Sequence, residues 1–284
     1  MDLLGGRQVA FNAACRGQWE AFAEHRRCLT DVLARGATSR GSRLCVLGAG
    51  NANDLDLPAL LAAHREVHLV DIDAESLALG AARQGVAGHP GLRLHGGVDV
   101  TATLGVLSGW SPTSAVGRAD LDALAAWPVS RAAAVLPGGF DRVASTCLLS
   151  QVLETAAHAL GRGHRQLADV EAALLAGHLR LMARLAAPGG EAVLVAESVS
   201  SDTLAELPSM SPDELAGLQP RLHREGNHFR GMHPQHLLAA LRADPSVGPR
   251  VASAASLMPW LWRLHARTYL VGGLAFRLGT DYGR

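Results

Sequence analysis

The spacing of apolar residues changes several times along the chain. Between residues 7 and 36 they recur at helical intervals, with Val9, Phe11 and Phe22 among them, which predicts one or two amphipathic helices. The run GSRLCVLGAG at 41–50 is mostly apolar and ends in glycines, as a buried parallel strand does. The chain is therefore expected to begin with helices and then to enter a sheet.

Helical and strand patterns continue to alternate after this first strand. Prolines at 112, 128 and 137 limit any helix over 101–137, and we interpret this stretch as an insertion. A long helical region runs from about 150 to 187 and is interrupted near 161–163. Further helices are expected over 54–64, 74–84 and 234–243, and strands over 66–73, 91–97, 140–149, 191–199, 250–257 and 267–277.

This order of elements predicts an α/β fold with a mostly parallel, seven-stranded sheet. The last two strands have no helix between them, so we expect an antiparallel C-terminal hairpin at one edge. The predicted organisation is a helical N-terminal cap over 1–40 followed by one α/β domain over 41–284. Ligands of such sheets bind beyond the carboxyl ends of the strands.

Composition removes several classes of function. The chain has 284 residues, and its 26 arginines balance 26 acidic residues, so no basic field would attract nucleic acid. It contains no lysine, which excludes a Schiff-base or phosphate-loop lysine. With neither a signal-peptide pattern nor a membrane-length apolar run, we expect a cytoplasmic protein that does not contact membranes. Reduced thiols are expected at Cys15, Cys28, Cys45 and Cys147.

A glycine-rich loop follows the first predicted strand. In VLGAGNAND at 46–54, glycines allow a ligand to approach the backbone, and the next helix offers free N–H groups. Asp71 ends the second strand 21 residues after Gly50, close to the spacing at which an acid binds a ribose diol. Asp73 is the competing candidate, and helix N-capping is the alternative role for Asp71. The two features fit either a dinucleotide or S-adenosylmethionine.

Five segments in this order resemble the class I S-adenosylmethionine-dependent methyltransferases, over roughly residues 40–280. They are VLGAGN, VHLVDID, GGVDVT with Asp99, FDRVASTCLLSQV and PGGEAVLVAE. The resemblance implies a Rossmann-like fold, S-adenosyl-L-methionine as cofactor, and direct in-line methyl transfer to an O-, N- or S-nucleophile of a small molecule. It also implies a set of cofactor contacts: Gly48, Ala49, Gly50, Asn51, Asn53, Asp71, Ile72, Asp99, Val100, Ser145, Thr146, Cys147 and Gln151.

Two positions depart from the family pattern. Val46 stands where members usually carry an acid, and Ala52 replaces the third glycine of the loop. Asn53 and Asp54 either hold the ammonium of the cofactor or cap the following helix. Nicotianamine synthases and similar enzymes, which move the aminocarboxypropyl arm of the same cofactor, also lack the acid. An aminocarboxypropyl transferase or a cyclase that releases methylthioadenosine is therefore the alternative function.

The sequence assigns no catalytic residue on the acceptor side. Histidines between 223 and 236 match no zinc spacing, so we expect no metal and interpret this segment as a polar wall of the acceptor pocket. Glu197 ends the fifth strand, and a homodimer is left open. The acceptor-side candidates are Glu197, His228, His233, Trp19 and His25.

Two tryptophans, Trp260 and Trp262, fall in the connection between the last two strands, where they require an apolar surface. One hypothesis is that the N-terminal helices close over the strand ends as a lid; the alternative is that these aromatic residues only pack the core. The lid hypothesis predicts that a chain without residues 1–36 folds but transfers no group.

Overall fold

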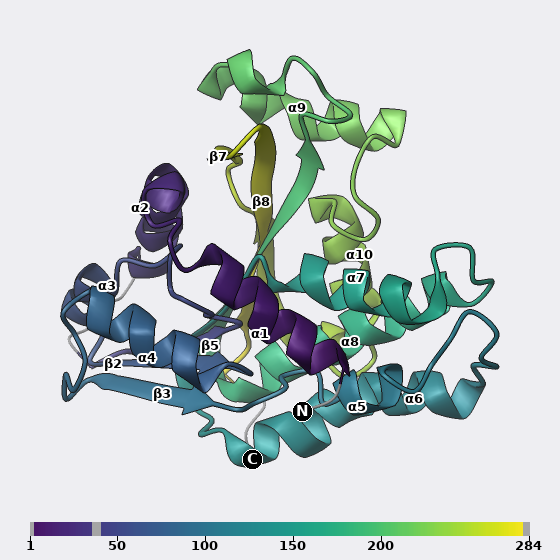
Figure 1. Ribbon diagram of the computed structural model, residues 1–284, viewed down its shortest axis with the longest axis horizontal. Helices are drawn as coiled ribbons and strands as arrows, with labels where there is room; N and C mark the ends of the chain where they lie inside the picture. The colour runs from purple at the N-terminus through teal and green to yellow at the C-terminus, as the bar shows by residue number, and fades with distance from the viewer. Residues whose placement is uncertain (1–2, 36–40, 281–284) are drawn as a thin grey trace.

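The computed structural model describes residues 3–35 and 41–280 and contains one eight-stranded sheet (Figure 1). The strand order is β3-β2-β1-β4-β5-β8-β6, and β7 also pairs with β8. The five strands from β3 to β5 are parallel, and β8 is antiparallel to its neighbours. The strands are β1 (Arg43–Leu47), β2 (Glu66–Asp71), β3 (Leu92–Gly96), β4 (Phe140–Thr146), β5 (Ala186–Ser200), β6 (Val251–Ser256), β7 (Trp260–Leu264) and β8 (Arg267–Leu278).

Helices cover both faces of this sheet because its inner strands are apolar on both sides. Leu44 and Val46 of β1 pack towards α2, α3 and α4, whereas Cys45 and Leu47 pack towards α7 and α8. The helices are α1 (Leu3–Cys15), α2 (Ala23–Ala34), α3 (Leu57–Ala63), α4 (Ala74–Arg83), α5 (Leu104–Leu107), α6 (Arg118–Trp127), α7 (Leu148–Leu160), α8 (Leu167–Leu185), α9 (Pro212–Glu225) and α10 (Pro234–Ala243). None of these helices is both long and apolar enough to cross a membrane.

The α/β class, the mostly parallel sheet and the C-terminal antiparallel strands are confirmed. The strand number was wrong, because the connection that holds the two tryptophans forms β7. β7 covers the first part of the outer edge of β8, and β6 covers the rest. Trp260 and Trp262 face one core, and Leu261 between them faces another. This is the alternation of a strand, but five residues gave too short a pattern to recognise.

The interpretation of 101–137 as an insertion was also wrong. This stretch forms α5 and α6, which belong to the crossover from β3 to β4. α6 packs closely on α8, where an added Cβ at Gly177 would lie 2.9 Å from the Leu124 carbonyl oxygen. Pro128 follows the last residue of α6 and begins a new helical turn, where a missing N–H costs little.

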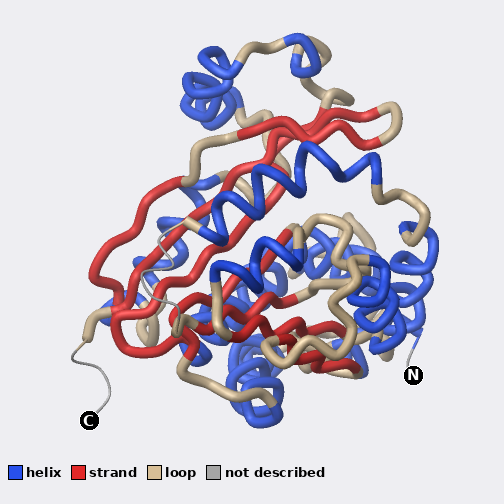
Figure 2. Tube along the Cα trace, turned by 90° about the vertical axis from the view of Figure 1, so that its left-hand side faces the viewer, coloured by secondary structure: helices blue, strands red, loops and turns tan. Residues whose placement is uncertain are grey.

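β5 and β8 extend beyond the parallel strands and carry α9 at their far end, as Figures 1 and 2 show. The helix α9 was not predicted, although Ser211 and Glu214 form a capping box at its start. A separate apolar cluster holds this extension together: Val199, Leu204, Leu207, Leu215, Leu218, Leu222, Leu261 and Leu270. The extension therefore lies beyond the carboxyl ends of the parallel strands.

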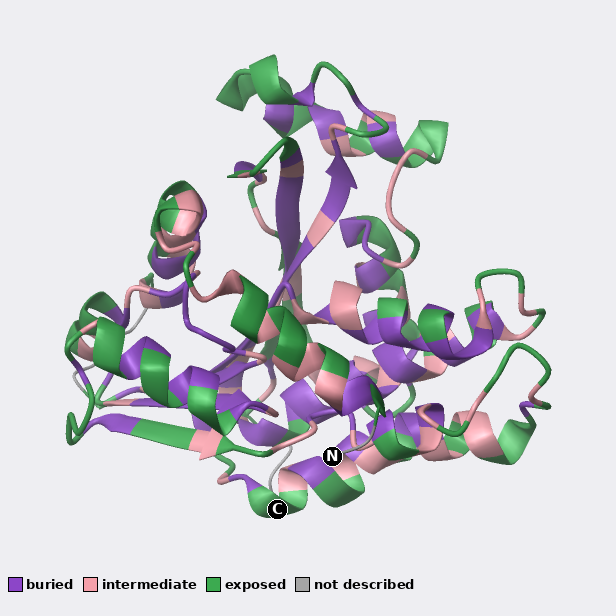
Figure 3. Ribbon diagram, in the orientation of Figure 1, coloured by how far each residue is buried: buried purple, intermediate pink, exposed green. Residues whose placement is uncertain are grey.

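The two N-terminal helices have different roles. α1 buries only Leu4 and Gly5, and Figure 3 shows most of its surface exposed or half-buried. α2 buries Leu29 and Leu33 completely, and the Leu33 carbonyl oxygen accepts hydrogen bonds from Arg142 (2.6 Å) and the His64 ring (3.1 Å). Removing 1–36 would open this core, so we now expect such a chain not to fold; the expectation from the sequence that it folds stays untested. Of the two helices, only α1 fits the lid hypothesis, because it buries little of its surface.

Candidate functional site

The loop after β1 forms the base of the site. Gly48 and Gly50 have φ values of +74° and +48°, which glycine adopts without strain. An added Cβ at Gly48 would lie 2.9 Å from the side chain of Leu148, so α7 also approaches the loop closely. Ala52, which replaces the third glycine, still adopts φ +50°. The loop therefore keeps a left-handed turn there without a glycine.

The following helix does not offer its N-terminus to this loop. We expected a helix over 54–64 with free N–H groups beside the glycines, but α3 begins only at Leu57. The Asp56 carboxylate accepts the Ala59 N–H at 3.0 Å and caps this helix. The ligand-facing backbone is consequently that of the loop itself.

Gly80 of α4 lets the helix approach the back of the loop. An added Cβ there would lie only 2.4 Å from the Asn51 carbonyl oxygen. We expect Gly80→Ala to displace the loop and to weaken cofactor binding at least tenfold, because ligand contacts depend on its backbone position. Calorimetric titration with S-adenosylhomocysteine measures this effect.

Gly217→Ala is the matched control, since it also adds one methyl group to a helix but has no atom within 4 Å of the new Cβ. We expect it to raise the free energy of unfolding by about 0.5–1 kcal/mol without changing affinity. Equal affinities for the two variants would show that the loop tolerates displacement.

Asp71 lies at the carboxyl end of β2 and is oriented by backbone groups. Its Oδ2 accepts the Gly50 N–H at 2.8 Å, and its Oδ1 accepts the Asp73 N–H at 2.9 Å and the Asn12 amide at 3.2 Å. Burial raises the pKa of Asp71, and the two backbone donors oppose that shift. The capping role belongs to Asp73, which accepts the Ser76 N–H at 3.0 Å at the start of α4.

A small cavity of about 70 Å³ lies beside Asp71. Asp99 borders it, but this carboxylate already accepts the N–H groups of Thr101 (2.9 Å) and Leu104 (3.0 Å) and so orders its own loop. The other walls are largely apolar, which suits a flat aromatic group. They include Ile72, Val98, Val100, Leu104, Leu107, Leu148 and Val152.

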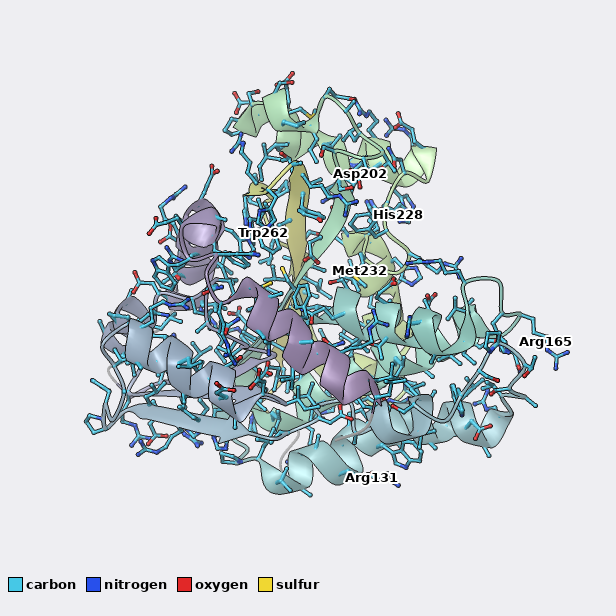
Figure 4. All side chains as sticks on the ribbon, viewed as in Figure 1. Arg131, Arg165, Asp202, His228, Met232 and Trp262 are labelled. Atoms are coloured by element: carbon cyan, nitrogen blue, oxygen red, sulfur yellow. The ribbon has the colours of Figure 1, made fainter. Side chains whose placement is uncertain are left out.

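A larger cleft of about 770 Å³ adjoins this cavity, within the range of ligand pockets. α1, α2 and α7 border it together with the glycine loop, the ends of β4 and β5, and the strands β7 and β8. Figure 4 labels three of its lining residues, Asp202, Met232 and Trp262, which come from separate segments. The parallel sheet thus meets the extension at this cleft.

The structure brings most of the expected cofactor residues to these two cavities. Ser145 is the exception: it is fully buried, and its hydroxyl lies 2.8 Å from the His178 ring of α8, on the other face of the sheet. The other expected cofactor residues each line at least one of the two cavities: Gly48, Ala49, Gly50, Asn51, Asn53, Asp71, Ile72, Asp99, Val100, Thr146, Cys147 and Gln151.

The acceptor-side candidates separate into two groups. Glu197 and His25 line the large cleft. His228 and His233 do not line it; their rings pack with that of His223, and His233 caps α10. Trp19 lies elsewhere, beneath the Arg26 guanidinium at 3.4 Å from its ring centroid.

His25 joins α2 to β7 through the two tryptophans. The Trp260 indole N–H donates to His25 Nδ1 at 3.0 Å, so the ring hydrogen is on Nε2, which lies 3.9 Å from the Cys147 sulfur. His25 also stacks on Trp262 with ring centroids 4.4 Å apart. Burial lowers the pKa of His25 to about 3, so this ring is neutral. These contacts support the packing hypothesis for the tryptophans, although Trp262 also lines the cleft.

Two carboxyl groups in the cleft, Asp54 and Glu197, form no ion pair among the described residues. Burial raises the pKa of Asp54 to about 6 from its ordinary 3.8, and the nearby Glu197 adds to that shift. Burial also raises the pKa of Glu197. Both groups are therefore more costly to ionise here than in water.

The raised pKa of Asp54 makes stability depend on pH. The folded chain binds the Asp54 proton more tightly than the unfolded chain does. The stability that the protonated carboxyl group contributes is therefore lost as pH rises from about 4 through 6. At pH 8 we expect Asp54→Asn to raise the free energy of unfolding by roughly 2–3 kcal/mol, a few degrees in Tm. Urea denaturation at pH 8 and pH 4 measures both values. A gain of the same size at pH 4 would contradict the assignment.

The lid hypothesis placed the N-terminal helices over the strand ends, but the individual α1 residues that line the site were not predicted. Gln8 and Asn12 line both cavities, and the Gln8 amide donates to the Thr155 hydroxyl at 3.0 Å. Their spacing of four residues places them on one helix face, a signal that the sequence did contain. Phe229, Asp202 and Tyr269 were also missed, because they reach the cleft only through the extension.

Comparison with known proteins does not establish an activity for the chain. No protein-family model and no curated protein match the chain. Three similar solved structures are the N-methyltransferase NodS from Bradyrhizobium japonicum WM9 in complex with S-adenosyl-L-homocysteine (9% identity, TM-score 0.43, 90% of this chain and 87% of that one), YcgJ from Bacillus subtilis (14%, 0.44, 89% and 98%), and an O-methyltransferase family protein from Burkholderia thailandensis (13%, 0.42, 96% and 60%). These likenesses concern the fold.

Proposed function

We propose that the chain is an S-adenosylmethionine-dependent methyltransferase that acts on a small-molecule acceptor. The observation that carries the proposal is the position of Asp71, which lines the small cavity and accepts the N–H of Gly50, a residue of the adjoining large cleft. A carboxylate there suits a ribose diol, and the small cavity beside it suits an adenine ring. The remaining cleft has room for an acceptor.

The buried polar groups of the cleft fit this cofactor. Asn51 Oδ1 is buried and has no hydrogen-bond partner among the described residues, and Asp54 has no ion pair there. Both would accept hydrogen bonds from the cofactor ammonium, directly or through water. A positively charged ligand would also lower the cost of ionising Asp54.

The cofactor would supply an activated methyl group, so the protein has to align the acceptor and exclude water. α1 is placed for the second task. Polar contacts join it to the cofactor loop: the Asn12 carbonyl accepts the Asn51 amide at 2.6 Å, and the Cys15 carbonyl accepts the Asn53 amide at 2.8 Å. Because α1 is held mainly by polar contacts and buries few residues, we expect it to open and close at a small cost in free energy.

The by-product of turnover tests the proposal. Incubation with S-adenosylmethionine and a metabolite extract should yield S-adenosylhomocysteine and a product heavier by one methylene unit, both detected by mass spectrometry. Methylthioadenosine would instead indicate aminocarboxypropyl transfer or cyclisation, for which no observation in the cleft gives specific support. Absence of both by-products together with absence of cofactor binding would refute a transferase.

A further inference from the structure

The acidic side chains that line the large cleft differ in whether they form ion pairs. Three of its acids pair with arginines that also line it: Glu154 with Arg162 at 2.6 Å, Glu171 with Arg230 at 3.4 Å, and Asp202 with Arg267 at 2.9 Å. These arginine side chains are 77%, 64% and 58% exposed, so the pairs lie towards solvent. An acceptor with a carboxylate or phosphate would have to break one of these pairs or bind at Arg7 of α1, which also lines the cleft and forms no ion pair among the described residues.

Glu197 is the opposite case. Its Oε2 atom is buried and has no hydrogen-bond partner among the described residues. The Ser150 hydroxyl and the Cys147 thiol favour its ionised form, but burial outweighs them and no cation contributes. Since an uncompensated buried carboxylate is costly, a ligand that brings a positive charge would be bound selectively.

An aromatic wall stands on the same side of the cleft. Trp262 contacts Phe22 and Tyr269 with ring centroids 4.9 and 5.7 Å apart, and all three residues line the cleft. Aromatic faces attract ammonium groups and also cover apolar bodies. His25, stacked on Trp262, is neutral and so adds no charge that would repel a cation.

From these observations we infer that the acceptor is a primary or secondary amine on an apolar or aromatic body, and that Glu197 binds its nitrogen and accepts its proton. This inference rests on the proposed function. The amine arrives as an ammonium ion and transfers one proton to the Glu197 carboxylate. Its lone pair then attacks the methyl carbon, the carbon–sulfur bond breaks with its electron pair passing to sulfur, and Glu197 later releases the proton to solvent.

Three probes that share one aromatic body separate the possible acceptor classes: 2-phenylethylamine, 2-phenylethanol and phenylacetate. In calorimetric titrations with the full chain we expect the amine to bind at least tenfold more tightly than the alcohol, and phenylacetate not to bind. Glu197→Gln should remove the preference for the amine, because a charge-assisted hydrogen bond is worth about ten- to a hundredfold in affinity. Equal binding of amine and alcohol, or an unchanged preference in Glu197→Gln, would overturn the inference.

Glu154→Gln is the matched control, because Glu154 lines the cleft but pairs with Arg162; it should retain the preference for the amine. Glu197→Gln should also keep its affinity for S-adenosylhomocysteine within about twofold. Methyl transfer to the alcohol or to a phenol, with no binding of the amine, would refute the amine while leaving the methyltransferase intact. Amine binding without any cofactor binding would refute the proposed function and show that Glu197 only binds amines.

Discussion

A chain that lacks residues 1–16 is expected to fold and to transfer no methyl group. α1 contributes only Leu4 and Gly5 to the buried interior, so its loss should lower Tm by a few degrees at most. It also provides Asn12, whose side chain contacts Asp71 and whose carbonyl contacts Asn51. Without α1 the strand ends are open to water, and we expect a fall in turnover of at least about a hundredfold.

Leu29→Ala provides the contrast for that deletion. Leu29 is fully buried in α2 and does not line either cavity, so the cavity left by this change should cost about 2–5 kcal/mol of stability. Turnover per folded molecule should be unchanged in this variant. Thermal unfolding and methyl-transfer assays on both proteins give the comparison. Full activity of the truncated chain would show that α1 is not a lid.

The second large effect is expected at Asp71. A charged, bidentate hydrogen bond to a ribose diol is worth about 1.5–3 kcal/mol, so Asp71→Ala should weaken S-adenosylmethionine binding by about ten- to a hundredfold. The fold should persist, because Asp71 contacts the loop and α1 rather than the apolar core. Calorimetric titration at constant salt measures the affinity.

Asn12→Ala distinguishes binding from lid attachment. It removes the Asn12 contact to Asp71 but leaves the carboxylate and its Gly50 contact in place. We expect its affinity for S-adenosylmethionine to fall by less than about threefold. If Asp71→Ala and Asn12→Ala weaken binding equally, Asp71 affects the affinity through its contact with α1 rather than through the ligand. If Asp71→Ala leaves the affinity unchanged, Asp71 is not part of the site.

The sequence was sufficient for the parts of the fold that obey local rules. The strand at 66–73 and the helix at 234–243 follow from hydrophobic period and length, and the structure has β2 and α10 there. The glycine loop and Asp71 were recognisable by spacing, since both lie at strand ends of a parallel sheet. These local patterns predicted the region in which the structure has the two candidate cavities.

Other features depended on contacts between distant segments, which no local pattern encodes. Ser145 and Thr146 are neighbours in sequence, yet they face opposite sides of the sheet, and the strand register decides which one reaches the cleft. His228 and His233 were plausible wall residues, but the path of the extension turns them away. That Glu197 lacks an ion-pair partner could not be predicted from the sequence, because its neighbours come from distant segments of the chain.

The most direct measurement is calorimetric titration of S-adenosylhomocysteine into the full chain, with Asp71→Ala as a parallel sample. We predict saturable binding of one ligand per chain in the micromolar range (~8 kcal/mol), and ten- to a hundredfold weaker binding by the variant. No binding to the full chain, in conditions where thermal unfolding shows it to be folded, would contradict the proposed cofactor site.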